Sequence, residues 1–275
     1  MGGRRVPVGR RRIGVEEHDG DKARYRIEAL AKGLQVLGAF AGSHRPLKTH
    51  ELASLAGLPT GTTFRIVATL EEFGYLEKSA DGGYRPGLSA LRLAGAAMRG
   101  SSLLEASERP LRRLADLTGE TVNLGVLTDD RVMYLARLHN ADLVTANVQV
   151  GTTLPAVYTS MGKVLLAGLS DEAVRRRISA NSFIDHAGPN AATNLDELLQ
   201  RLAVVRAAGY AVQDEELARG LRSIAVAVAN DQGTIVAAIN VAVAVDNRTV
   251  ATLVGELIPP LKAAADEIGT RLEHQ

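Results

Sequence analysis

Apolar residues at helical spacing, punctuated by glycines, fill residues 27–74 and restrict the folds open to this part of the chain. The first series predicts a helix that ends near Gly42; it consists of Ile27, Leu30, Ala31, Leu34, Leu37 and Ala41. A second helix is predicted from His50 to Ala56, with Thr49 as its capping residue and Gly57 as its stop.

A third helix and a hairpin are predicted directly after these two. The helix runs from about Thr60 to Phe73 and stops at Gly74; its expected core residues are Val67, Leu70 and Phe73, with Ile66 on the flank. Two extended runs, 75–78 and 84–86, then surround an Asp-Gly turn, which predicts a β-hairpin. This succession of three short helices and a hairpin is typical of a winged helix-turn-helix domain.

In such a domain the third helix lies in the major groove and presents its N-terminal residues to base edges. Hydroxyl groups and an arginine at this end predict base contacts by Thr60, Thr62, Thr63 and Arg65. The hairpin is expected to bring Lys78 and Arg85 to phosphates, and Thr49 completes the predicted DNA-binding set. The alternative is a helical hairpin used only for packing.

The distribution of charge agrees with a nucleic-acid-binding domain joined to a second domain. Residues 1–87 hold 14 Lys and Arg against 10 Asp and Glu, whereas residues 88–275 hold 18 against 21. Chance variation would explain so small an excess as well. Residues 1–23 predict a mobile basic tail whose Arg10–Arg12 cluster is either a solvated end or a nonspecific phosphate contact.

The second part of the chain predicts an α+β fold. Residues 88–100 predict a linker helix with a broad apolar face, and a helix from Ser101 ends at Gly119. Strands are predicted at residues 121–128, 131–138, 143–150, 222–228 and 234–243, and helices at residues 162–168, 171–179, 195–208 and 250–272, the last interrupted at Pro259-Pro260. Strands paired in hairpins and mixed with helices favour an antiparallel sheet.

A possible ligand site is indicated where a helix begins near Thr159 or Ser160. The free amides at a helix N-terminus attract anions. Ser223 and Asn240 interrupt apolar strand runs, so they either satisfy nearby backbone groups or line a pocket. Spacing alone slightly favours the structural role over a carboxylate pocket.

The catalytic signals are weak. The chain has no cysteine, its six histidines are dispersed, and it lacks the G-x-S-x-G, P-loop and H-E-x-x-H motifs, so no metal or cofactor is expected. The acidic triplet Asp214–Glu216 is interpreted as a solvated loop or helix start, with acid-base work as the alternative. No apolar run suggests a membrane span or a secretory signal, so a cytoplasmic protein is expected.

Several segments, taken together in this order, carry a resemblance to a known family. They are residues 29–34, the Thr-rich helix with residues 69–75, Leu154-Pro155 with residues 161–167, Gly209-Tyr210 leading into residues 214–216, and residues 220–226 and 237–241. Over residues 24–273 the chain resembles the IclR-family transcriptional regulators. Ser160-Met161-Gly162 with residues 221–224 is similar to the subgroup that controls aromatic-acid breakdown through the β-ketoadipate pathway.

The resemblance implies a division into a winged-helix domain at residues 24–87, a linker helix used in dimerisation at 88–105, and a GAF-like effector-binding domain at 106–275. By position, effector contacts would fall on the amides near Ser160 and Met161, the apolar wall on Leu154, and polar contacts on the side chains of Gln213, Ser223 and Asn240, with Ala242 beside them. Some relatives have Asp where Gln213 stands, Cys at Ser223, and small hydroxyl residues at Asn240 and Ala242. These departures leave the ligand open.

The implied function is a ligand-responsive transcriptional regulator, a repressor or an activator. Its partners would be double-stranded DNA with a palindromic operator, a second copy or a dimer of dimers, and a small organic acid; the candidates are protocatechuate, 4-hydroxybenzoate and β-ketoadipate. One alternative is a small-molecule enzyme with an accessory winged helix that uses Asp214 or Glu215 as a base. Another is a sensor or protein-interaction module that binds no DNA, in which the Thr60–Arg65 face is covered.

Overall fold

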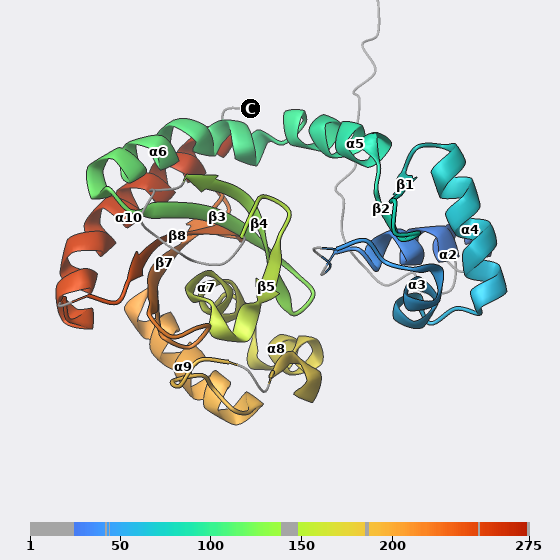
Figure 1. Cartoon of the computed structure of the whole chain (residues 1–275). Helices are drawn as coiled ribbons and strands as arrows, with labels where there is room; N and C mark the ends of the chain where they lie inside the picture. The colour runs from blue at the N-terminus through green and yellow to red at the C-terminus, as the bar shows by residue number, and fades with distance from the viewer. Residues whose placement is uncertain are drawn as a thin grey trace, which may run out of the picture. The chain divides into compact units, whose positions relative to one another are not determined.

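The computed structural model describes residues 25–41, 43, 45–138, 148–184, 187–246 and 248–273. The chain divides into two compact units, Met1–Ala90 and Leu91–Gln275, which are described separately (Figure 1). The predicted tail, residues 1–23, lies outside the described residues.

The first unit has the order of elements expected of a winged helix. Helices α2 (Glu28–Gly38), α3 (Thr49–Ala56) and α4 (Thr60–Glu72) precede an antiparallel hairpin of β1 (Leu76–Lys78) and β2 (Tyr84–Pro86). Gly57 and Gly74 end α3 and α4 with positive φ angles of 64° and 71°, which glycine adopts without strain. The core side chains of this unit are Val36, Phe40, Leu47, Leu52, Val67, Leu76 and Tyr84.

Three predictions for this unit are wrong in detail. The first helix ends at Gly38 and not near Gly42, and Ile27, Leu30 and Leu34 of its apolar series are each more than half exposed while Val36 and Phe40 are buried. Phe73 is 65% exposed because α4 ends at Glu72, so the helical period no longer places the next side chain in the core. Thr49 is the first helical residue of α3 and not its cap; the cap is Lys48, whose amide donates to Glu51 Oε2 at 2.8 Å.

The second unit is built on one antiparallel sheet of six strands in the order β5-β4-β3-β8-β7-β6. The strands are β3 (Thr121–Thr128), β4 (Arg131–Leu138), β5 (Thr153–Pro155), β6 (Ala211–Asp214), β7 (Leu221–Ala229) and β8 (Ile235–Ala244). Its helices are α5 (Leu88–Arg99), which crosses the boundary between the units, α6 (Ser102–Thr118), α7 (Ser160–Ala167), α8 (Asp171–Arg177), α9 (Leu195–Ala208) and α10 (Val250–Glu273), with short 3₁₀ turns η2 (Ala156–Tyr158) and η3 (Ala180–Ser182). The predicted α+β fold with an antiparallel sheet is therefore confirmed.

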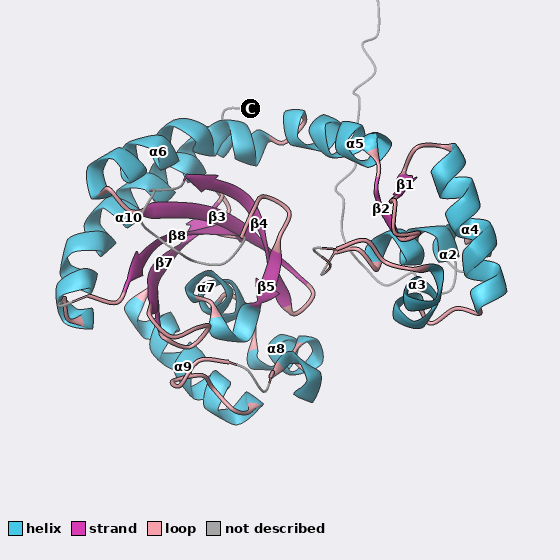
Figure 2. Ribbon diagram, viewed as in Figure 1, coloured by secondary structure: helices cyan, strands magenta, loops and turns pink. Residues whose placement is uncertain are grey.

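Each face of this sheet carries its own helices (Figure 2). Helices α6 and α10 pack against one face, where alternate strand residues such as Leu124, Ile224 and Ile239 are buried. Helix α7 packs against the other face, and α9 packs on α7. The facing strand positions include Gly125, which has no side chain, and Ala225 and Ala238, whose side chains are small, so α7 can approach the sheet.

Two short strands and the continuity of one helix were not predicted from the sequence. Strands β5 and β6 are too short and too close to loops for an alternating apolar pattern to be visible. Of the predicted strand 143–150, residues 143–147 lie outside the described ranges and 148–150 are not in a strand. Helix α10 runs through Pro259-Pro260, because Leu253, Leu257 and Leu261 bury one face against the sheet and tertiary packing supports the weakened turn. Across the described ranges, no helix combines the length and apolarity needed to span a bilayer.

Candidate functional site

The third helix of the winged helix, α4, divides its predicted DNA-binding residues between two environments. Thr60 and Arg65 are exposed, and Thr62 is half-buried. Thr63 is fully buried, and its Oγ1 donates to the carbonyl oxygen of Pro59 at 3.2 Å. Thr63 lies one turn before Val67, on the core face, so the prediction that it contacts a base is wrong.

The predicted phosphate contacts lie on and near the hairpin. Lys78 and Arg85 are exposed, and Thr49 is half-buried at the start of α3. Arg85 Nη2 lies 3.1 Å from Glu77 Oε2, its cross-strand neighbour. An exposed pair of this kind contributes about 0–1 kcal/mol, so it is weak enough for Arg85 to exchange Glu77 for a phosphate.

In the second unit, four of the predicted site residues converge beneath the sheet. Ser160 Oγ lies 2.7 Å from Ser223 Oγ, and Asn240 Nδ2 donates to Ser160 Oγ at 3.3 Å. Ser223 Oγ also donates to Gln213 Oε1 at 3.4 Å. All four side chains are buried, and they come from α7, β6, β7 and β8. We call Ser160, Gln213, Ser223 and Asn240 the polar cluster.

Strand register explains why these residues meet. Gln213 is opposite Ser223 in the β6–β7 pair, and Ser223 is opposite Ala242 in the β7–β8 pair. Asn240 lies two residues before Ala242 and therefore points to the same face, the one covered by α7. Ala242 is buried on the same face, between Ser223 and Asn240.

The N-terminus of α7 completes the cluster with backbone groups. Thr159 caps the helix, its Oγ1 accepting from the Gly162 amide at 3.0 Å. The amides of Ser160 and Met161 belong to the first turn, whose N–H groups have no partner within the helix. A Cβ on Gly162 would lie 2.1 Å from the Ala156 carbonyl oxygen, so only glycine lets η2 pass this close to α7.

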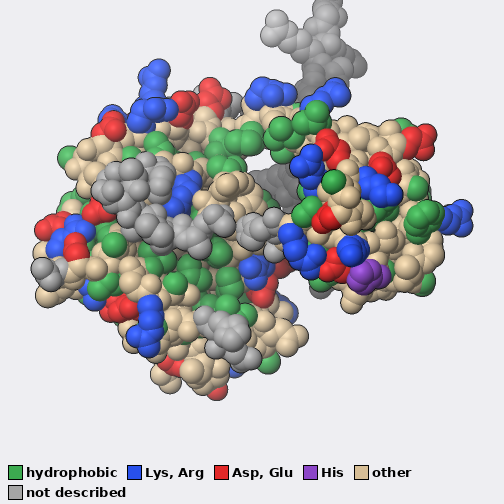
Figure 3. Space-filling view, viewed as in Figure 1, with side chains coloured by type: hydrophobic (Ala, Val, Ile, Leu, Met, Phe, Trp, Pro, Cys, Tyr) green, Lys and Arg blue, Asp and Glu red, His purple; other side chains and the backbone are tan. Residues whose placement is uncertain are grey.

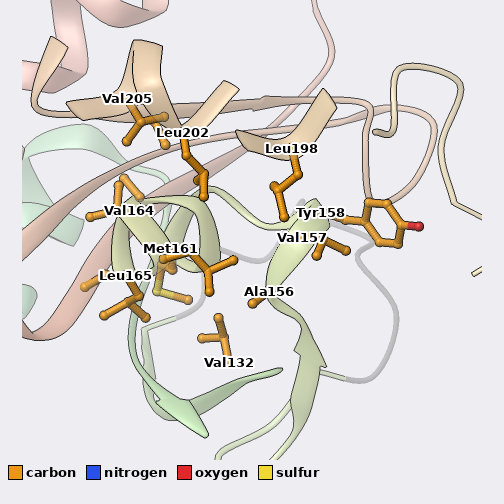
Figure 4. Close-up of a cluster of buried hydrophobic side chains, with 14 of the residues drawn as sticks. Val132, Ala156, Val157, Tyr158, Met161, Val164, Leu165, Leu198, Leu202 and Val205 are labelled. Atoms are coloured by element: carbon orange, nitrogen blue, oxygen red, sulfur yellow. The ribbon is translucent and has the colours of Figure 1, made fainter. Parts of the chain in front are cut away.

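Met161 and Leu154 are apolar members of the predicted site. The Met161 side chain is fully buried in the core between α7, β4 and α9, so only its backbone can serve the cluster (Figure 4). Its neighbours in this core include Val132, Val157, Leu165, Leu198 and Leu202. Leu154 of β5 is half-buried and packs against the same core.

Two further polar residues extend the cluster and were missed from the sequence. Asn123 of β3 is buried and donates from Nδ2 to Asn240 Oδ1 at 2.8 Å, while its Oδ1 accepts from Arg137 Nη1 at 3.2 Å. Burial lowers the pKa of the Arg137 guanidinium. The signal was present, because Asn123 also interrupts an apolar strand run, as Ser223 and Asn240 do.

A buried ion-pair network lies beside the polar cluster. Lys163, one turn after Ser160, forms an ion pair with Glu216 and donates to the Val212 carbonyl oxygen at 2.6 Å. Glu216 Oε2 lies 2.9 Å from Arg201 Nη1 of α9. Burial lowers the pKa of Lys163, against the opposing effect of Glu216.

The acidic triplet thus differs from the expected solvated loop or helix start. Asp214 ends β6 and pairs with Arg222 at 2.6 Å, Glu215 accepts from the Gly220 amide at 2.9 Å, and Glu216 is buried. The prediction failed because β6 was missed, so nothing in the sequence placed the triplet against α7 and α9.

The polar cluster presents hydrogen-bond donors, which suit an acceptor group. Hydroxyl and amide donors surround it, together with first-turn amides, and within the described residues no group of three His, Asp or Glu is placed to hold a metal ion. Gln213 Nε2 is buried and has no hydrogen-bond partner in the described part of the chain. An unpaired buried donor of this kind is available to an oxygen of a ligand.

A winged helix with an exposed arginine on its third helix, carried on the same chain as an α+β unit that buries a polar cluster, is the arrangement of a transcriptional regulator with an effector-binding domain. The chain belongs to the IclR family of bacterial transcriptional regulators. The IclR helix-turn-helix domain matches residues 29–80, and the C-terminal domain of the bacterial transcriptional regulator IclR matches residues 95–270.

Individual relatives agree with this assignment. The chain is 32% identical over 249 residues to the Pca regulon regulatory protein of Pseudomonas putida, covering 88% of this chain and 83% of that protein. It is 30% identical to the transcriptional repressor IclR of Escherichia coli (strain K12), covering 78% and 80%. A solved structure of an IclR homolog complexed with 4-hydroxybenzoate, from Microbacterium hydrocarbonoxydans, superposes with a TM-score of 0.72 at 27% identity, covering 90% of this chain and all of that one.

Proposed function

We propose that this regulator senses a small carboxylate of an aromatic-acid pathway in the polar cluster and controls genes for aromatic-acid breakdown. Two relatives support the class of ligand: the Pseudomonas putida protein is a regulator of the Pca regulon, and the Microbacterium homolog is complexed with 4-hydroxybenzoate. The candidate effectors are protocatechuate, 4-hydroxybenzoate and β-ketoadipate. As a reader of chromosomal operators, the protein would act in the cytoplasm.

The unpaired Gln213 amide is the observation that carries the sensing proposal. A buried donor without an acceptor costs about 1–3 kcal/mol, and a bound ligand oxygen would remove that cost. In the proposed site, the Ser160 and Met161 amides hold the carboxylate at the N-terminus of α7. The side chains of Ser223, Asn240 and Gln213 bind the other polar groups of the ligand. Leu154 forms part of the apolar wall against its carbon skeleton.

The domain boundaries that we propose are a DNA-binding domain at residues 24–87, a linker at 88–105 and an effector-binding domain at 106–275. DNA would be contacted by Thr60, Thr62 and Arg65 at base edges, and by Thr49, Lys78 and Arg85 at the backbone. Thr63 is excluded because it is buried.

Exposed apolar side chains support a dimer on a palindromic operator. Helix α5 has no buried residue, and Leu88, Leu91 and Leu93 are 60–69% exposed; apolar side chains lie at the surface along this helix (Figure 3). Ile27, which precedes α2, forms a second exposed series with Leu30 and Leu34 of that helix. Apolar series of this kind suit pairing between two copies, or a dimer of dimers.

The effector can change transcription only if it binds one arrangement of the dimer more tightly than another. Thermal denaturation of the full chain with each candidate acid, and with benzoate and acetate as controls, tests the ligand. We expect one of the three candidate acids to raise the midpoint more than benzoate or acetate does, and Ser223→Ala to reduce the shift. No shift with any of these acids would refute the proposed ligand class.

The division of roles between the domains is tested by DNA binding at low salt. Arg65→Ala should weaken binding to the operator and leave the thermal shift unchanged. Ser223→Ala should bind the operator as the wild type does and respond less to the acid. Equal loss of DNA binding in both variants would contradict the proposed roles.

A further inference from the structure

A large aromatic side chain is exposed on the helix that reads DNA. Phe64 of α4 is 61% exposed, whereas Thr63 and Val67, its neighbours on the core side, are at most 1% exposed. The apolar ring of Phe64 is therefore available to a partner that lies against the outward face of α4.

The outward face of α4 has an unusual shape. Successive residues are about 100° apart around a helix, which places Phe64 and Arg65 on either side of Gly61 and Ala68. Gly61 is exposed, and a Cβ built there would meet no atom within 4 Å. Because packing within the chain does not require glycine at this helical position, the bare surface suits close approach by something outside the chain.

Charge determines which half of α4 faces a duplex. Glu71 and Glu72 are exposed at the C-terminal end and would repel phosphates. Arg65 lies in the N-terminal half, and Lys48 and Lys78 are exposed in the same unit. The N-terminal half, which carries Gly61 and Phe64, is therefore the half that enters the major groove.

We propose that Phe64 is a specificity-determining residue that reads thymine, its ring packing on the C5-methyl group in the major groove. Thymine is the one DNA base that presents a methyl group there, and apolar contact is the means of recognising it. Gly61 and Ala68 let the helix approach closely enough for that contact, while Arg65 hydrogen-bonds a neighbouring base or phosphate. This inference rests on the proposed operator binding.

The test is a chemical double-mutant cycle on the full-length protein. A duplex is first selected from a random library, and each thymine is then replaced by deoxyuridine, which lacks only the methyl group. We expect the wild type to lose about fourfold in affinity per half-site at one thymine position, the value of one buried methyl group. Phe64→Ala should bind the thymine and deoxyuridine duplexes equally.

Phe73→Ala is the matched control, because Phe73 is a similarly exposed phenylalanine just beyond the other end of α4. It should keep the wild-type preference for thymine. If an enriched duplex shows no loss at any thymine, or if Phe64→Ala retains the loss, the inference about Phe64 is overturned and operator binding stands.

Two other outcomes also decide the matter. A change in the oligomeric state of Phe64→Ala, with thymine discrimination intact, would assign the ring to an interface between copies. A selection that enriches no sequence would overturn the proposed function and this inference together.

Discussion

Replacing Gln213 by methionine should stabilise the unliganded protein, in contrast to most substitutions of buried residues. Gln213 is 1% exposed, its Nε2 has no partner among the described residues, and its Oε1 accepts one long bond of 3.4 Å from Ser223. The unpaired donor costs about 1–3 kcal/mol, whereas the long bond returns about 0.5 kcal/mol. Methionine has nearly the same length and no polar hydrogen. We therefore expect a net gain of about 1 kcal/mol, or about 2–4 °C in Tm.

The same substitution should impair sensing. If Gln213 donates to a neutral oxygen of the ligand, its loss should weaken effector binding by up to about tenfold, since such a hydrogen bond contributes about 0.5–1.5 kcal/mol. Urea denaturation of both proteins gives the stability, and titration with the acid that shifts the wild-type midpoint gives the affinity.

Asn123→Leu is the control for this pair of measurements. The Asn123 amide is satisfied on both sides, by Asn240 at 2.8 Å and Arg137 at 3.2 Å. Its removal should lower the free energy of unfolding by about 1–3 kcal/mol. If Gln213→Met is instead less stable than the wild type, the Gln213 amide is already satisfied inside the fold, and the reasoning about the site fails.

Three further predictions follow from buried groups. Thr63→Val removes the bond to Pro59 and should lower the free energy of unfolding by about 1 kcal/mol without changing the preferred operator sequence, as measured by urea denaturation and library selection. Burial raises the pKa of Tyr134 to about 12, so its contribution to stability is complete below pH 10 and is lost as the pH rises from 10 through 12. Wild type and Tyr134→Phe should therefore diverge by about 3 kcal/mol across that window in pH-dependent denaturation. Lys163→Met leaves Glu216 short of one buried cation and should cost about 3 kcal/mol, whereas an unchanged denaturation midpoint would show that the pair adds nothing to the fold.

Elements whose apolar residues recur at a regular helical or strand spacing could be placed from the sequence. Contacts that depend on how distant strands pair could not. Strands β3 and β4 begin and end at the predicted residues because alternation and the Asp129-Asp130 turn mark both ends. Thr63 was misplaced because a threonine suits either face of a helix, and only the packed core decides between them. Asn123 was missed because its position opposite Asn240 follows from the pairing of β3 with β8, two strands far apart in the sequence.

The contact between Lys163 and the Val212 carbonyl has a consequence for how this sensor can change. One side chain of α7 holds the strand residue just before Gln213, while Ser160 projects from the same helix one turn earlier. Lys163, which lies outside the polar cluster, therefore fixes the distance between α7 and β6. New effector preferences can then arise by exchanging side chains at Gln213, Ser223 and Asn240, with the supporting framework left as it is.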